Sequence, residues 1–107
     1  TIDSAEPKSY AYCSDTMYNE NYFAQIANAT LLYHESTFLN DMLDRAVITH
    51  HTTALQAGEI GLKTNAKKLL IGHFSARYKT LNELLDEAKI NFPSTDLAIE
   101  GKTFFIE

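Results

Sequence analysis

The apolar residues of this chain switch repeatedly between the two-residue period of a β-strand and the 3.6-residue period of an α-helix. Strand-like runs occupy residues 9–13, 30–33 and 68–72, and a stretch with helical spacing follows each of them. Strands that alternate with helices indicate an α/β fold, because the helices cover a sheet built from the strands. The sequence contains no repeat or linker, so we expect one folding unit over residues 1–107.

The segments between the predicted strands carry helix signals. Residues 19–28 place apolar side chains on one helical face, and residues 39–46 fit a short helix. A further helix is predicted over residues 53–65, where Thr53 and Gln56 have the spacing of a capping box. Small residues dominate one face of this last helix, so it should pack closely against its neighbour.

The last third of the chain predicts one more helix and a hairpin. The helix covers residues 81–91, with Thr80 and Glu83 at capping-box spacing, and Pro93 ends it. Residues 97–106 alternate around a Gly-containing turn, which predicts a β-hairpin.

The composition excludes several classes of protein. Hydrophobic residues make up 45% of the chain and charged residues 21%, which favours a packed interior over disorder. The apolar runs are far shorter than the roughly 20 residues of a membrane helix, and no signal-like segment is visible. The single cysteine, Cys13, cannot form an internal disulfide and is expected to be buried. We therefore expect a cytoplasmic protein with no membrane contact.

The net charge of −5 argues against a self-sufficient nucleic-acid binder. Phosphate contacts draw on clustered lysine and arginine residues, and this chain has few of them. If RNA is the substrate, most of the phosphate contacts must lie outside these residues.

Side chains that can bind metals follow the predicted strands. Asp15, His34-Glu35 and His73 each stand at a strand end, and His51 stands at a helix start. Ligands of α/β proteins bind beyond the carboxyl ends of the strands, and carboxylate and imidazole donors suit zinc or manganese. Asp15 and His73 are therefore candidate metal ligands. Taken alone, their spacing favours a turn or cap role for Asp15 and a buried structural role for His73.

Four segments in this order resemble ribonuclease Z. They are Tyr-Cys-Ser-Asp-Thr at residues 12–16, Leu-Tyr-His-Glu-Ser-Thr-Phe at 32–38, His-Thr-Thr-Ala-Leu-Gln-Ala at 51–57, and Leu-Ile-Gly-His-Phe-Ser-Ala-Arg-Tyr at 70–78. The resemblance implies that the chain is the carboxy-terminal half of a metallo-β-lactamase αβ/βα sandwich. The family's His-x-His-x-Asp-His signature, a further histidine ligand and the arm that clasps tRNA belong to the amino-terminal half, which these residues do not include.

The resemblance assigns roles to four residues. Asp15 corresponds to the carboxylate that bridges two metal ions, and His73 to the last histidine ligand of the second ion. Glu35 and His51 correspond to the pair that protonates the leaving oxygen. An imidazole held by a carboxylate suits that step, because the negative charge favours the imidazolium form. A purely structural hydrogen bond between Glu35 and His51 is the alternative.

The loop after His73 supplies candidate contacts to the substrate phosphate. Arg77 can form bidentate charge-assisted bonds, and Ser75 can add a hydroxyl donor. A solvated position or an ion pair within the fold is the alternative for Arg77. We expect His34 and Phe38 in the core or behind the site.

Two of the departures from the family pattern fall in the segments that carry site residues, and a third replaces small alanine positions by Gly58 and Gly61. The usual Gly-His-Ser-Thr reads His50-His51-Thr52-Thr53 here, so two histidines compete, and we choose His51 because it keeps the His-x-Thr-Ala register. The usual threonine before the metal histidine is Gly72. None of these changes removes a side chain that the chemistry requires.

The resemblance implies a metal-dependent endoribonuclease that removes the 3′ trailer from precursor tRNA and leaves a 3′ hydroxyl. Two zinc ions are the expected cofactors, with manganese or another divalent ion as the alternative. The expected partners are precursor tRNA, the amino-terminal half of the same protein and a second copy in a homodimer. The isolated chain is expected to be inactive. Alternative functions are another metallo-β-lactamase-fold phosphodiesterase or sulfatase, and a non-catalytic RNA-docking or assembly module.

Overall fold

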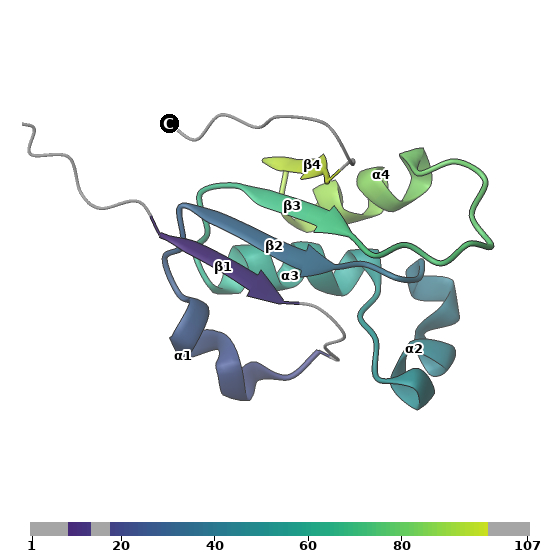
Figure 1. The fold of residues 1–107 in the computed structure, drawn as a ribbon, viewed down its shortest axis with the longest axis horizontal. Helices are drawn as coiled ribbons and strands as arrows, with labels where there is room; N and C mark the ends of the chain where they lie inside the picture. Colours follow the sequence, from purple (N-terminus) through teal and green to yellow (C-terminus); the bar gives the residue numbers. More distant parts are fainter. Residues whose placement is uncertain (1–8, 14–17, 99–107) are drawn as a thin grey trace, which may run out of the picture.

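A four-stranded parallel sheet forms the centre of the protein (Figure 1). The computed structural model describes residues 9–13 and 18–98. Neighbouring strands in the order β1-β2-β3-β4 are all parallel. The strands are β1 (Tyr10–Cys13), β2 (Leu31–Glu35), β3 (Leu69–Gly72) and β4 (Thr95–Leu97). All strands therefore end at the same edge of the sheet.

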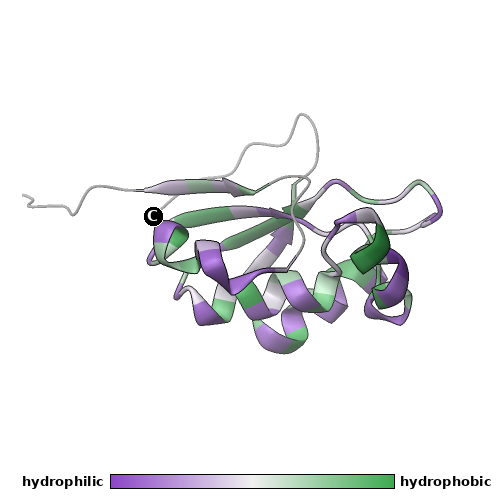
Figure 2. Ribbon diagram, turned by 90° about the horizontal axis from the view of Figure 1, so that it is seen from below, coloured by the Kyte–Doolittle hydropathy of each residue, from purple (hydrophilic) through white to green (hydrophobic). Residues whose placement is uncertain are grey.

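Helices form the connections that parallel strands require. They are η1 (Glu20–Tyr22) with α1 (Phe23–Ile26), η2 (Asn40–Met42) with α2 (Leu43–Thr49), α3 (Ala54–Lys63) and α4 (Asn82–Asn91). Figure 2 shows α3 and α4 on the same side of the sheet. Their buried residues, such as Ala57 and Leu84, belong to one cluster with those of the strands. None of the helices in the described ranges is both long and apolar enough to cross a bilayer.

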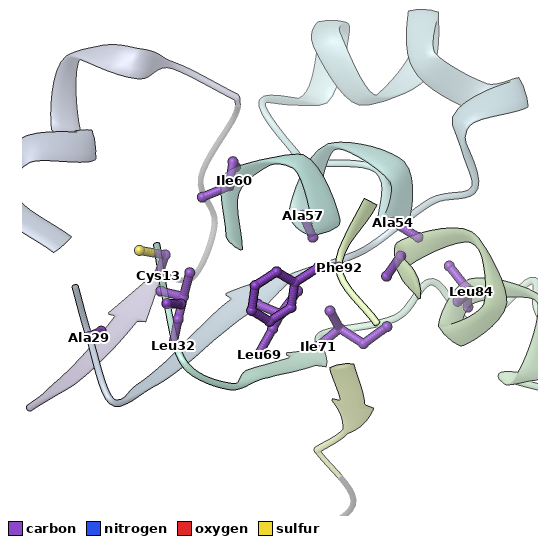
Figure 3. Close-up of a cluster of buried hydrophobic side chains, with 12 residues drawn as sticks. Cys13, Ala29, Leu32, Ala54, Ala57, Ile60, Leu69, Ile71, Leu84 and Phe92 are labelled. Atoms are coloured by element: carbon purple, nitrogen blue, oxygen red, sulfur yellow. The ribbon is translucent and has the colours of Figure 1, made fainter. Parts of the chain in front are cut away.

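The core lies between the sheet and helices α3 and α4 (Figure 3). Leu32, Leu69 and Ile71 project from the strands and are fully buried, as is Ile60 of α3. Cys13 is also buried, as expected. Burial of such side chains stabilises the fold by about 1.5–3 kcal/mol each before entropy is counted.

Helices α3 and α4 touch backbone to backbone. A Cβ atom at Gly58 would overlap the carbonyl oxygen of Ala88, so this contact requires glycine. The prediction that the small-residue face packs closely is confirmed. The capping box of α3 is also present, since Thr53 accepts from the Gln56 N–H and the Gln56 side chain accepts from the Thr53 N–H.

Two local predictions need correction. Helix α4 begins at Asn82, and its cap residue Leu81 makes no side-chain capping bond, so the Thr80–Glu83 capping box is wrong. The helix starts too late for Thr80 to stand at its cap, and Glu83 falls in its first turn. The predicted hairpin lies mostly outside the described residues. The strand that is described there, β4, starts at Thr95 and pairs in parallel with β3.

The sheet face opposite the core carries aromatic residues. Side chains alternate between the two faces of a strand, and Ala11 and Cys13 of β1 join the core. Tyr10 and Tyr12 therefore project from the opposite face, where they are 64% and 73% exposed. The Tyr12 ring stacks on Tyr33 of the neighbouring strand at 4.5 Å.

The same face explains the glycine before His73. The Tyr33 hydroxyl fills the space that a Cβ atom at Gly72 would need. A threonine at position 72 would therefore displace Tyr33 and disturb its stacking on Tyr12. The glycine is a local adjustment to a large neighbour.

Candidate active site

Three predicted site residues meet at the carboxyl edge of the sheet. Glu35 ends β2 and pairs with Gly72, the last residue of β3, so His73 leaves the sheet beside Glu35. His51 lies in the segment that joins α2 to α3. One ligand atom from each of Glu35, His51 and His73 lies within 4.8 Å of the others. Residues far apart in the sequence thus form one cluster.

The Glu35 carboxylate is fully buried and receives several hydrogen bonds. Its Oε2 atom accepts from the Thr37 hydroxyl at 2.6 Å, from Nδ1 of His51 at 2.9 Å and from the Thr52 N–H at 3.3 Å. These donors offset the cost of removing the carboxylate from water. The arrangement holds Glu35 in one orientation.

His51 binds the Glu35 carboxylate through one ring nitrogen. Its Nδ1 donates to Glu35, and for this tautomer the Nε2 atom is the acceptor. The side chain is 22% exposed, and the edge of its ring packs on Phe38. The His51 N–H donates to the Ala46 carbonyl at 2.8 Å, which fixes the backbone as well.

The neighbouring histidine, His50, lies outside the cluster of Glu35, His51 and His73. His50 caps the end of α2 in the left-handed conformation with a φ of 60°, and its N–H binds the carbonyls of Ala46 and Val47. It is exposed and does not belong to the cluster. The geometry favours His51 over His50, in agreement with the motif register.

His73 is accessible to solvent. Its backbone is left-handed with a φ of 59°, and its side chain is 45% exposed, which excludes the buried structural role. The Nδ1 atom lies 3.3 Å from the Thr37 hydroxyl and 3.9 Å from Oε2 of Glu35. Thr37 thus contacts both Glu35 and His73. Sequence reasoning missed its role, although Thr37 stands two residues after Glu35, a spacing that places side chains on one face of an extended chain.

The candidate ligand Asp15 lies outside the described residues. Cys13, the last residue of β1, pairs with His34 in β2, so β1 ends at the same edge as the cluster. The position of Asp15 at that edge remains a prediction from the motif.

The loop after His73 is attached to the site through its backbone. The Ser75 N–H donates to the Thr37 carbonyl at 3.0 Å, and the Ser75 hydroxyl accepts from the Arg77 N–H at 3.3 Å. Arg77 is exposed, and its guanidinium lies 5.7 Å from the centre of the Phe38 ring. Within residues 9–13 and 18–98 it forms no ion pair with a carboxylate. The ion-pair alternative therefore finds no partner in that part of the chain.

His34 and Phe38 are buried, as expected. His34 donates from Nδ1 to the Glu35 carbonyl at 2.9 Å and accepts from the Tyr22 hydroxyl through Nε2 at 3.0 Å. Burial lowers the pKa of His34, which keeps the ring neutral. The side chain stands behind the site and holds the end of β2.

Comparison with solved structures defines the class of the fold. The metallo-β-lactamase-fold protein YhfI of Bacillus subtilis has a TM-score of 0.77 and 28% identity, covering 85% of this chain and 37% of that one. A long-form RNase Z from yeast has a TM-score of 0.71 and 35% identity, and covers 83% of this chain and 12% of that one. The chain has the metallo-β-lactamase fold over these residues, and the predicted fold class is confirmed.

Sequence comparison identifies the family within this class. Ribonuclease Z of Cytophaga hutchinsonii is 52% identical over 105 residues, and ribonuclease Z of Phocaeicola vulgatus is 52% identical over 107 residues. No protein-family model matches the chain. Over almost its whole length, the chain is homologous to part of ribonuclease Z. It spans 34% and 35% of the length of these two relatives, or about a third.

Proposed function

We propose that the complete protein is a metal-dependent endoribonuclease that removes the 3′ trailer from precursor tRNA, and that this chain supplies its proton donor. The observation that carries the proposal is the 2.9 Å contact between Nδ1 of His51 and the buried Glu35, beside the exposed His73. The names of the relatives, ribonuclease Z, support the choice of substrate.

The arrangement around His51 suits general acid catalysis. Cleavage of the phosphodiester bond between the tRNA and the trailer leaves a 3′ oxygen on the tRNA. This oxygen must gain a proton. Glu35 holds Nδ1 of His51 in a hydrogen bond, so in the proposal Nε2 delivers a proton to the leaving oxygen. Such a donor contributes about 10²–10⁴-fold to the rate of a reaction.

The side chains at and around His73 suit the binding of a divalent metal ion. Metal-binding histidines usually have their other ring nitrogen held by a hydrogen-bonding partner, and Thr37 stands next to Nδ1 of His73. Glu35 fits less well, because its Oε2 atom already accepts from three donors. We therefore assign His73 and Asp15 as ligands, and Glu35 as the acceptor that orients His51. The ion, zinc in our proposal, would supply a Lewis acid that stabilises charge on the phosphate.

The remaining ligands and most of the tRNA contacts must come from other parts of the complete protein. Two protein ligands are too few for a zinc site, which has at least three. In this proposal Arg77 and Ser75, in the loop after His73, contact the scissile phosphate. The net charge of −5 leaves the long-range attraction of tRNA to other regions. We also propose that the complete protein is a cytoplasmic homodimer. Within the described residues no helix covers the aromatic sheet face of this chain, and in an αβ/βα sandwich the amino-terminal half would cover that face.

A second candidate is a phosphodiesterase or sulfatase that acts on a small ester. The fold that this chain shares with YhfI is not confined to proteins named ribonuclease Z. The tRNA-processing function is preferred because the ribonuclease Z relatives reach 52% identity, against 28% for YhfI.

Single-turnover cleavage of precursor tRNA by the complete protein tests the proposal. We expect His51→Ala to slow the chemical step by about 10²–10⁴-fold while the metal content is retained. His50→Ala is the matched control, and we expect a rate close to that of the unmodified protein. A His51→Ala protein that cleaves at full rate, or a product without a 3′ hydroxyl, would contradict the proposal.

A further inference from the structure

Glu87 of helix α4 contacts two distant segments with one carboxylate oxygen. Its Oε2 atom accepts from the Asn40 N–H at 2.9 Å and from the Leu55 N–H at 3.0 Å. Asn40 is the first residue of η2, and Leu55 is the second residue of α3. Backbone N–H groups at helix starts have no partner within the helix, so an anionic acceptor stabilises both.

The two segments that Glu87 joins form the base of the region that carries His51. Residues 37–40 run beside residues 52–55, and we call this pair of segments the neck. The Thr37 N–H donates to the Thr52 carbonyl at 3.0 Å, and the Ala54 N–H donates to the Phe38 carbonyl at 2.8 Å. Everything between the two segments, including α2 and His51, projects from the neck. Figure 1 shows α2 at one end of the molecule, away from the strands.

Side chains of the neck complete the connection. The Thr53 hydroxyl donates to Oδ1 of Asn40 at 3.0 Å, so the two segments are joined by side chains as well as by backbone. Tyr78 provides a second attachment, because its hydroxyl accepts from the Leu39 N–H at 2.8 Å. The Glu87 side chain, which comes from helix α4, contacts both segments of the neck directly.

The close approach of α3 and α4 brings Glu87 to this position. Gly58 allows the α3 backbone to reach the carbonyl of Ala88, the residue after Glu87. Leu55 lies one helical turn before Gly58, so the N–H of Leu55 comes within reach of Glu87. The small-residue packing of α3 therefore leads directly to the bond at the neck.

We propose that Glu87 is a positioning residue for His51, on which it acts through the neck. The inference rests on the proposed function, in which His51 protonates the leaving oxygen. Residues that fix the geometry of a site from a distance have large effects, because a shift of about 1 Å in a reacting group costs up to about 10²-fold in rate. Glu87 is half-buried at the neck and does not belong to the cluster of Glu35, His51 and His73.

The test uses the complete protein. It measures the single-turnover rate of precursor-tRNA cleavage with the protein in excess, KM from multiple-turnover rates, and bound metal. We expect Glu87→Ala to lower the rate by about 10- to 100-fold, with KM and metal content unchanged. Glu87→Gln should recover most of the rate, since its amide oxygen can accept both N–H groups. Glu83→Ala is the matched control, because Glu83 is an exposed glutamate one turn earlier in α4.

A double-mutant comparison separates positioning from a general loss of stability. If Glu87 acts through His51, adding Glu87→Ala to His51→Ala should change the remaining rate by no more than about twofold. The same loss in both backgrounds, or a Glu87→Ala rate equal to that of Glu83→Ala, would overturn the inference. Should Glu87→Ala not fold, Glu87→Asp decides by the same criteria, because its shorter side chain cannot reach both N–H groups. A full rate in His51→Ala alone contradicts the proposed function itself.

Discussion

The Thr37 hydroxyl joins Glu35 to His73. It donates to Oε2 of Glu35 at 2.6 Å and lies 3.3 Å from Nδ1 of His73. A hydroxyl has one proton to donate, and here Glu35 receives it, so the ring nitrogen of His73 meets the oxygen lone pairs. One side chain thus connects the proposed proton-donor pair to the proposed metal ligand.

Replacing this hydroxyl should weaken metal binding. In the complete protein, Thr37→Val keeps the shape of the side chain but removes one hydrogen-bonding partner of His73, and we expect about 10–100-fold lower metal affinity. Titration with a competing chelator measures the change. Thr37→Ser is the control and should retain most of the affinity, whereas equal losses in both variants would argue against a role for the hydroxyl.

Metal content should separate the two proposed roles. Asp15→Ala and His73→Ala each remove a proposed ligand, so cleavage should be abolished and bound metal lost. His51→Ala should keep its metal and slow only the chemical step. Elemental analysis of the purified variants gives the answer. If the His51 variant lost its metal while the His73 variant kept it, the roles would be assigned the wrong way round.

His34 should make stability depend on pH. Burial lowers the pKa of this histidine from its ordinary value near 6.5, so the unfolded state binds more protons than the folded state in weak acid. The contribution of neutral, buried His34 to the free energy of unfolding is present above about pH 6.5. It is lost as the pH falls through the lowered pKa of the folded state. The midpoint of thermal unfolding, measured at several values from pH 8 to pH 5, shows this decline in stability. His34→Gln should be less stable but show a shallower decline below pH 6.5, and an unchanged decline would exclude His34 as its source.

The isolated 107-residue chain should self-associate. Tyr10 and Tyr12 are largely exposed on a sheet face that no described helix covers, and large exposed apolar patches commonly bind a partner. Light scattering over a range of concentrations checks this. Tyr12→Lys should shift the equilibrium toward monomer, and a stable monomer at high concentration before mutation would refute the prediction.

The isolated chain should not cleave precursor tRNA or bind two metal ions tightly. Asp15 and His73 are its assigned ligands, and two ligands leave an ion mostly hydrated. Activity assays and calorimetric metal titration of the 107-residue chain measure both. Supplying the remainder of the protein in trans should restore cleavage if the parts reassociate. Sustained, chelator-sensitive cleavage by the chain alone would contradict the assignment.

Local sequence signals were sufficient for the positions of the first three strands and for the capping box of α3, whereas the choice of His51 over His50 rested on the family register. Each local signal depends on residues within a few positions of one another, such as Thr53 and Gln56. The resemblance added the grouping of Glu35, His51 and His73, which spacing alone could not provide. The prediction of a capping box at Thr80 and Glu83 was wrong because α4 begins at Asn82, so Thr80 lies one residue before the cap position. The spacing of two residues does not by itself fix where a helix starts.

Tertiary structure decided the contacts between segments that are distant in the sequence. Thr37 reaches His73, Glu87 reaches Asn40 and Leu55, and Tyr33 fills the space above Gly72. These contacts depend on the register between parallel strands and on the distance between two packed helices. Periodicity and motif spacing describe which residues share a face of one element, but the register and the distance are set by packing between elements.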